Sequence, residues 1–189
     1  MRVGVFALQG DVREHLLILS NLGVQTVEVR NAEALLEIDG LIFPGGESTT
    51  MSKLIDIFQL RKPLEDFIAL GKPVFGTCAG MIMLATEVLD NASGQQSLSA
   101  MDISVRRNAF GSQLDSFETV LNFAGESTKV AFIRAPIVER VGEGVEVLAR
   151  LEDGRIVGVR QGNLLATSFH PELTGDATVH SYFLGMISS

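Results

Sequence analysis

The chain has 189 residues, a length that favours one domain with a hydrophobic core of its own. Its 15 basic and 23 acidic residues give a net charge of −8, so nucleic acid and anionic membranes are poor candidate partners. One cysteine and three histidines exclude an internal disulfide and argue against a zinc site with several ligands. No apolar run reaches the roughly 20 residues of a membrane helix, and we expect a cytoplasmic protein with a reduced thiol.

The first half of the chain alternates between short apolar strands and helices. Asp11 and Glu14 have the spacing of a capping box and mark the start of the first helix. Strands are expected over residues 2–8, 24–29, 40–43 and 73–76, and helices over residues 12–22, 32–36, 50–60, 63–70 and 81–87. This alternation predicts a parallel sheet with helices on both faces.

The second half consists mainly of strands that follow one another closely. They are expected over residues 103–107, 117–121, 130–133, 145–151, 155–160 and 163–169, before a closing helix over residues 176–187. Asp153-Gly154 predicts a hairpin turn, and the polar residues 90–99 a surface loop. We therefore predict a single α/β domain over residues 1–189, with a mostly parallel open sheet flanked by helices and extended by antiparallel strands.

The segment Gly76-Thr77-Cys78-Ala79-Gly80 lies between an apolar strand and an apolar helix. It matches the Gly-x-nucleophile-x-Gly elbow, with cysteine as the nucleophile. In such a turn the glycines leave room around a strained residue, and the helix N-terminus favours a thiolate. The N–H group of Ala79 is then placed to bind an oxyanion. For this segment alone, the alternative is that Cys78 is a small buried hydrophobic residue.

A second segment, Ser168-Phe169-His170-Pro171-Glu172, follows the last expected strand. Residues two apart on an extended chain share a face, so His170 and Glu172 are expected side by side. Pro171 disfavours helical backbone at His170. A carboxylate that orients an imidazole is the acid–base half of a nucleophile–base–orienter triad. The alternative is a solvated histidine in a loop.

A third segment, Phe43-Pro44-Gly45-Gly46-Glu47-Ser48-Thr49-Thr50, follows the third strand. Two glycines at the carboxyl end of a strand can expose backbone N–H groups to a ligand. The segment lacks the lysine and the spacing of a P-loop, which argues against nucleotide binding. An ordinary glycine turn with a serine or threonine helix cap explains it equally well.

These three segments occur together with several others that run from near one end of the chain to near the other. The others are Leu8 to His15, Arg107-Asn108, Asp115 to Glu118, Phe132 to Pro136 and the continuation Leu173-Thr174. The sequence is similar to triad-type (class I) glutamine amidotransferases, which have a flavodoxin-like α/β fold. It resembles most closely the glutaminase subunits of pyridoxal 5′-phosphate synthase, and residues 9–15, 47–50 and 132–136 indicate this subfamily.

The resemblance implies a glutaminase that hydrolyses L-glutamine to L-glutamate and ammonia, with no cofactor and no metal. Cys78 would form a glutamyl thioester, His170 would shuttle protons, and Glu172 would orient His170. The backbone N–H groups of Gly46 and Ala79 would bind the oxyanion. The glutamine-binding positions of the family correspond to Gly46, Glu47, Ser48, Arg107, Ile133 and Arg134. Without the resemblance, surface ion pairs would explain the two arginines.

The resemblance also implies a partner synthase, which receives the ammonia within a large hetero-oligomer and makes pyridoxal phosphate. The turn at residues 9–11 and the helix over residues 12–22 are a candidate docking surface, with core packing as the alternative. His15 and His180 show no partner pattern and receive no catalytic role. Residues 88–100 match the family poorly and are expected to touch no motif residue.

Three other functions stay open at this point. The chain could be the glutaminase of another synthase, such as the one that makes imidazole glycerol phosphate. It could be a binding protein on the same fold whose thiol has lost its chemistry. It could also be a cysteine peptidase or a related thiol hydrolase.

Overall fold

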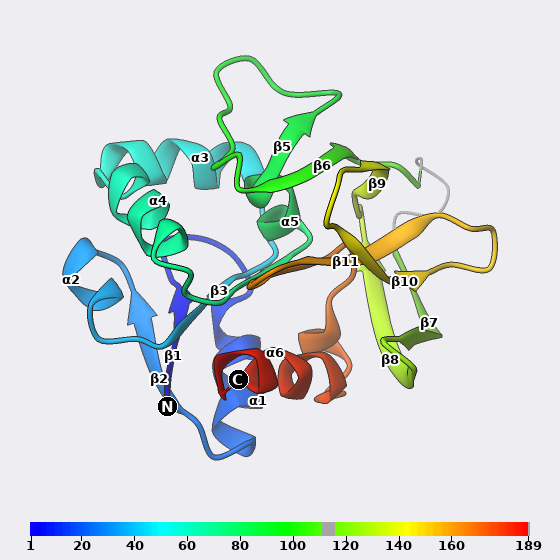
Figure 1. Cartoon of the computed structure of the whole chain (residues 1–189), viewed down its shortest axis with the longest axis horizontal. Coiled ribbons are helices and arrows are strands. Elements are labelled where there is room, and N and C mark those ends of the chain that lie inside the picture. Colours follow the sequence, from blue (N-terminus) through cyan, green and yellow to red (C-terminus); the bar gives the residue numbers. More distant parts are fainter. Residues whose placement is uncertain (111–115, 189) are drawn as a thin grey trace.

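The computed structural model describes residues 1–110 and 116–188, so Asp115 of the motif segments lies outside the described residues. A central sheet has helices on both sides (Figure 1). Its strands are β1 (Arg2–Phe6), β2 (Gln25–Val29), β3 (Gly40–Phe43), β4 (Val74–Thr77), β5 (Ala85–Val88), β6 (Met101–Arg106), β7 (Ser116–Phe123), β8 (Glu126–Ile133), β9 (Ile137–Val141), β10 (Glu146–Arg150), β11 (Ile156–Gln161) and β12 (Leu164–Thr167). The helices are α1 (Val12–Asn21), α2 (Ala32–Leu35), α3 (Ser48–Ile57), α4 (Arg61–Ala69), α5 (Ala79–Leu84), the short 3-10 helix η1 (Pro171–Leu173) and α6 (Thr178–Ser188).

The parallel part of the sheet has the strand order β2-β1-β3-β4-β12. All residues of β3, β4 and β12 are buried, as expected for short apolar strands that helices cover on both faces. Phe43 pairs with Gly76 and Thr167 pairs with Thr77, so these three strands end at nearly the same level. The predicted parallel α/β sheet is confirmed.

The antiparallel part continues from β12 through β11, β10, β7 and β8. The hairpin between β10 and β11 contains Gly154 at φ 89°, which agrees with the predicted Asp153-Gly154 turn. Strand β9, which pairs with β6 and β11, was not predicted. The helix expected over residues 81–87 was partly wrong. It ends at Leu84, because Ala85 is extended and begins β5, which pairs with β6.

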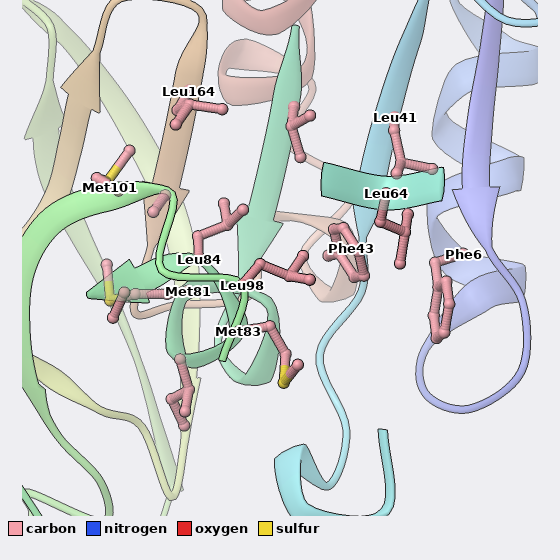
Figure 2. Close-up of a cluster of buried hydrophobic side chains, with 14 of the residues drawn as sticks. Phe6, Leu41, Phe43, Leu64, Met81, Met83, Leu84, Leu98, Met101 and Leu164 are labelled. Atoms are coloured by element: carbon pink, nitrogen blue, oxygen red, sulfur yellow. The ribbon is translucent and has the colours of Figure 1, made fainter. Parts of the chain in front are cut away.

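Two hydrophobic clusters fill the space on the two faces of the sheet. One lies under α2 to α5 and includes Phe6, Phe43 and Leu84 (Figure 2). The other includes Phe75, Phe169, Phe183 and other side chains under α1 and α6. Each fully buried side chain of this size stabilises the fold by roughly 1.5–3 kcal/mol relative to an exposed one. None of the helices in the described ranges is long and apolar enough to cross a membrane.

Two helix starts differ from those expected. Asp11 occupies the N-cap position of α1, but its carboxylate caps no backbone N–H group, so the predicted capping box is wrong. The cap of α3 is Glu47, whose carboxylate accepts hydrogen bonds from the N–H groups of Thr49 and Thr50. The serine or threonine cap considered for this turn is therefore not present.

The packing around the elbow predicts opposite effects for two glycine-to-alanine substitutions. A Cβ atom at Gly80 would lie 2.3 Å from the carbonyl oxygen of Phe43, whereas a Cβ atom at Gly185 in α6 meets nothing within 4 Å. We expect Gly80→Ala to lower the free energy of unfolding by at least about 2 kcal/mol, since backbone must move. Gly185→Ala should raise it by about 0.5–1 kcal/mol, because alanine favours a helix.

Urea unfolding of both variants and the unchanged protein measures these effects. A Gly80→Ala protein as stable as the unchanged one would show that the elbow does not need the glycine.

Candidate active site

The predicted site residues come together from the ends of several strands. Gly46, Cys78 and His170 follow the neighbouring strands β3, β4 and β12, and Arg107, Ile133 and Arg134 lie at the ends of β6 and β8. A cleft with a volume of about 400 Å³ opens there, within the usual size range of ligand pockets. Of the predicted residues, the cleft is lined by Gly46, Glu47, Ser48, Cys78, Ala79, Arg107, Ile133, Arg134 and His170. Glu172 is buried behind His170 and does not line it.

Cys78 lies on a strained turn between β4 and α5. Its backbone has φ 49° and ψ −102°, which a non-glycine residue rarely adopts. The turn is held because the N–H group of Cys78 donates to the carbonyl of Thr167 at 2.8 Å. The side chain lines the cleft at the start of α5, with Sγ 3.8 Å from the carbonyl oxygen of Ile133. This placement favours a nucleophile over an inert core residue.

His170 and Glu172 form a buried pair next to Cys78. Nδ1 of His170 lies 2.6 Å from Oε1 of Glu172, and the two residues are only 3% and 5% exposed. The N–H group of His170 donates to the carbonyl of Ala131 at 2.7 Å, so the backbone fixes the ring. The predicted side-by-side arrangement is therefore present, and the solvated loop histidine is not.

The surroundings of His170 favour its charged form. Burial alone would lower its pKa, but hydrogen bonds and charge interactions with Cys78 and Glu172 outweigh burial and raise the pKa to about 10. Burial raises the pKa of Glu172, while the hydrogen bond and charge of His170 act in the opposite direction. An imidazolium next to a thiol is the arrangement that activates cysteine nucleophiles.

The glycine turn after β3 packs against both His170 and the turn after β1. A Cβ atom at Gly45 would lie 2.1 Å from Cε1 of His170, and one at Gly46, where φ is +152°, would lie 2.4 Å from Oε1 of Gln9. The carbonyl of Gly45 accepts a hydrogen bond from the N–H group of Asp11 at 3.0 Å. These contacts fix the turn at the cleft, next to Cys78. The oxyanion role of the Gly46 and Ala79 N–H groups stays a prediction.

Glu47 and Arg107 form a charged pair at the edge of the cleft. Although burial would raise the pKa of Glu47, hydrogen bonds from Thr50 and Thr49 lower it to about 2. Nη2 of Arg107 lies 3.7 Å from Oε1 of Glu47. The guanidinium is therefore oriented by a carboxylate that stays ionised at every pH of interest.

The loop at residues 89–100 contributes to this orientation. Nη1 of Arg107 donates to Oε1 of the buried Gln95 at 3.2 Å, and its backbone N–H group donates to Asp90 at 2.8 Å. The expectation that residues 88–100 touch no motif residue is wrong. No local pattern marked Gln95, because its role depends on a tertiary contact.

Several further residues line the cleft that were not among the predicted site residues. Asp11, Asn108 and Ile82 line the cleft. Asn108 at φ 43° and Arg134 at φ 45° are in the left-handed region at the cleft edge. Such strain often accompanies functional positions, but nothing in the sequence predicts it.

Asp11 is the acidic residue of the cleft closest to the histidine. Its Oδ2 lies 3.5 Å from Nδ1 of His170. Burial raises its pKa, His170 opposes this effect, and Glu14 adds to it. Ligand-type atoms of Asp11, His170 and Glu172 lie within 4.8 Å of one another. Because Nδ1 of His170 already bonds Glu172, the geometry is that of an oriented acid–base pair, and no metal is needed to explain it.

His15 and His180, for which the sequence showed no partner pattern, lie next to each other in the structure. Both are fully buried, and they contact each other at 2.9 Å. Nε2 of His15 lies 3.6 Å from Oε1 of Glu172. The two histidines are 165 positions apart, so no local pattern could reveal the contact.

The geometry predicts that the three histidines differ in charge near neutral pH. We expect His170 to be an imidazolium at about pH 8, while burial keeps His15 and His180 neutral. Glu172→Gln should bring the pKa of His170 down toward the ordinary value of about 6.5, since the stabilising carboxylate is lost. Nitrogen-15 NMR of the ring nitrogens across the pH range measures this.

Glu28→Gln, on an exposed position of β2, is the matched control and should leave all three signals unchanged. If His170 of the unchanged protein also loses its charge near pH 6.5, its surroundings do not raise its pKa and the prediction is wrong.

Comparison with known proteins agrees with this site. The profile of the SNO glutamine amidotransferase family matches residues 5–189. The chain is 58% identical to "Pyridoxal 5′-phosphate synthase subunit PdxT" of Corynebacterium jeikeium, over 99% of this chain and 97% of that protein. It is 55% identical to the protein of the same name from Salinispora tropica, over 98% and 96%.

Solved structures give the same result at the level of the fold. A crystal structure of a glutamine amidotransferase superposes with a TM-score of 0.93 at 49% identity, over 99% of each chain. A chain in the structure of PurLQS from Thermotoga maritima shares the fold alone, with a TM-score of 0.66 at 17% identity over 97% of each chain. The family match over nearly the whole length, together with relatives of this identity, shows that the chain belongs to the SNO glutamine amidotransferase family.

Proposed function

We propose that this protein is the glutaminase component of pyridoxal 5′-phosphate synthase, which hydrolyses L-glutamine to L-glutamate and ammonia for a synthase partner. The observation that carries the proposal is the placement of Cys78, on its strained elbow, in the same cleft as His170, whose ring is paired with the buried Glu172. Family membership and the names of the curated relatives support the choice of substrate and pathway.

In the first half of the reaction, the Cys78 thiolate attacks the side-chain amide carbon of glutamine. The carbonyl oxygen becomes an oxyanion, which the backbone N–H groups of Gly46 and Ala79 bind. His170 gives its proton to the amide nitrogen, the carbon–nitrogen bond breaks, and ammonia leaves. The product on the enzyme is a glutamyl thioester at Cys78.

In the second half, neutral His170 takes a proton from a water molecule as that water attacks the thioester. The carbon–sulfur bond breaks, and the thiolate–imidazolium pair is restored. The product leaves with a new γ-carboxyl group, which loses its proton to water to give glutamate. Glu172 stabilises the imidazolium at both stages.

The charges at the edge of the cleft fit a small zwitterion. Arg107 and Arg134 offer guanidinium groups for the α-carboxylate of glutamine. Glu47 keeps a negative charge near Arg107 and fixes its direction. Gly46, Ser48 and Ile133 complete the proposed glutamine-binding set.

The partner in this proposal is the synthase protein that uses the ammonia, within a large hetero-oligomer. α1 is the proposed docking element, because Leu17 on it is 61% exposed and Leu22 just after it is 36% exposed. Exposed large apolar side chains of this kind are common at protein interfaces. The cytoplasmic location expected from the sequence stays a prediction.

Removal of the nucleophile tests the catalytic part of the proposal. We expect Cys78→Ala to abolish ammonia release from glutamine in the presence of the synthase partner, because no thioester can form. A glutamate dehydrogenase-coupled assay measures the ammonia, and Gly185→Ala, away from the cleft, is the folded control. Undiminished ammonia release by Cys78→Ala would contradict the proposal, as would stimulation only by the synthase that makes imidazole glycerol phosphate.

Substitution on the outer face of α1 tests the docking part. Leu17→Glu should lower partner-stimulated ammonia release at least about tenfold by placing a charge in an apolar contact, while activity without partner stays the same. Leu36→Glu, which alters an 86% exposed leucine after α2, is the matched control and should have no effect. Titration with the synthase partner measures both, and equal stimulation of all three proteins would exclude α1 as the docking element.

A further inference from the structure

Buried polar side chains extend from Glu172 into the interior of the protein. Nδ1 of His15, on α1, lies 2.9 Å from Nε2 of His180, on α6. Nε2 of His15 lies 3.3 Å from Oγ1 of Thr77 and 3.6 Å from Oε1 of Glu172. Neither histidine lines the cleft, so neither contacts a substrate bound there.

Both interior histidines are neutral near neutral pH. Burial lowers the pKa of His15 well below its ordinary value, and the nearby His180 and His170 lower it further. Burial lowers the pKa of His180 to about 4, although the Asp176 carboxylate acts in the opposite direction. Each ring therefore carries a single N–H group, and its position decides what the ring can donate to.

The contacts of His180 indicate where these protons lie. Nδ1 of His180 is buried and has no hydrogen-bond partner among the described residues. An orphaned N–H group in a protein interior is rarer than an orphaned acceptor. We therefore assign the proton of His180 to Nε2, from which it donates to Nδ1 of His15. The proton of His15 must then lie on Nε2, facing Thr77 and Glu172.

The carboxylate of Glu172 favours the same assignment. The opposite tautomer would direct a lone pair of His15 at a negative oxygen, whereas an N–H dipole attracts it. At 3.6 Å this contact is longer than a hydrogen bond, so it acts as a charge–dipole interaction. The carboxylate has few other partners: Oε1 also contacts Nδ1 of His170, and Oε2 has no hydrogen-bond partner among the described residues.

We propose that His15 is a positioning residue of the triad: its Nε2–H group keeps Glu172 ionised and directed at His170, and His180 fixes the tautomer that makes this possible. The effect on turnover rests on the proposed glutaminase function, but the effect on Glu172 does not. The charged and titratable groups around this pair are His170, Glu172 and Asp176, and Asp11 lies 3.5 Å from His170.

The first test needs no variant. Nitrogen-15 NMR of the unchanged protein near neutral pH should show the Nε2–H tautomer for both His15 and His180. A proton on Nδ1 of His15 would overturn the proposal, because no N–H group would then face Glu172.

The second test compares two substitutions that differ in one donor. His15→Gln can keep an amide N–H group near the former Nε2 position, whereas His15→Asn reaches only the Nδ1 position. We expect His15→Asn to lower kcat about tenfold with KM nearly unchanged, and to lower the titration midpoint of His170 by about one pH unit. His15→Gln should stay within about threefold of the unchanged protein.

His180 provides a second pair of variants. His180→Gln keeps a donor toward Nδ1 of His15, whereas His180→Asn removes it. The His180→Asn variant should therefore lower the titration midpoint of His170, but by less than His15→Asn does. A folded His15→Asn protein with an unchanged His170 midpoint would overturn the proposal. If the Asn and Gln variants lose the same amount of kcat and the titration midpoint of His170 does not shift, the proposal also fails, and His15 and His180 serve only to pack the core.

These measurements separate the two proposals. If the unchanged protein releases no ammonia even with its synthase partner, the glutaminase function fails, while the tautomers and the His170 midpoint still decide the role of His15. If neither Asn variant folds, the tautomers of the unchanged protein give the decision alone.

Discussion

The candidate active site depends on a pair of titratable side chains that are both buried. His170 and Glu172 meet at 2.6 Å, and water reaches almost none of either residue. A buried imidazolium or carboxylate alone would give up its charge, so each is stable only while the other is held in place. The fold holds His170 through its backbone hydrogen bond to Ala131 of β8, and the start of η1 at Pro171 places Glu172. The absence of a side chain at Gly45 leaves the space that the ring occupies.

The parts of this site that could be predicted from the residues themselves are features contained within a single short stretch of the chain. The elbow around Cys78 and the pair of His170 and Glu172 follow from spacing and backbone preference, so they could be derived residue by residue. The parallel sheet was predictable for the same reason, since each strand–helix unit is a local pattern. The resemblance to a family supplied the binding positions that no local pattern indicated.

The parts that were missed depend on contacts between distant segments. β5 was predicted as the end of a helix, because its pairing with β6 is not visible in its own residues. Asp11 has the sequence of a helix cap, but the proximity of His170 gives its carboxylate another environment. Gln95 and His15 are ordinary polar residues until Arg107 and Glu172 lie next to them.

α1 has two faces with different surroundings. Its outer face presents Leu17 to solvent, and its inner face carries His15 next to Glu172. Leu17 and His15 are two positions apart on one helix. The exposed surface of α1 and the buried contact with Glu172 therefore share a single backbone segment, and the sequence of that segment has to satisfy both surroundings at once.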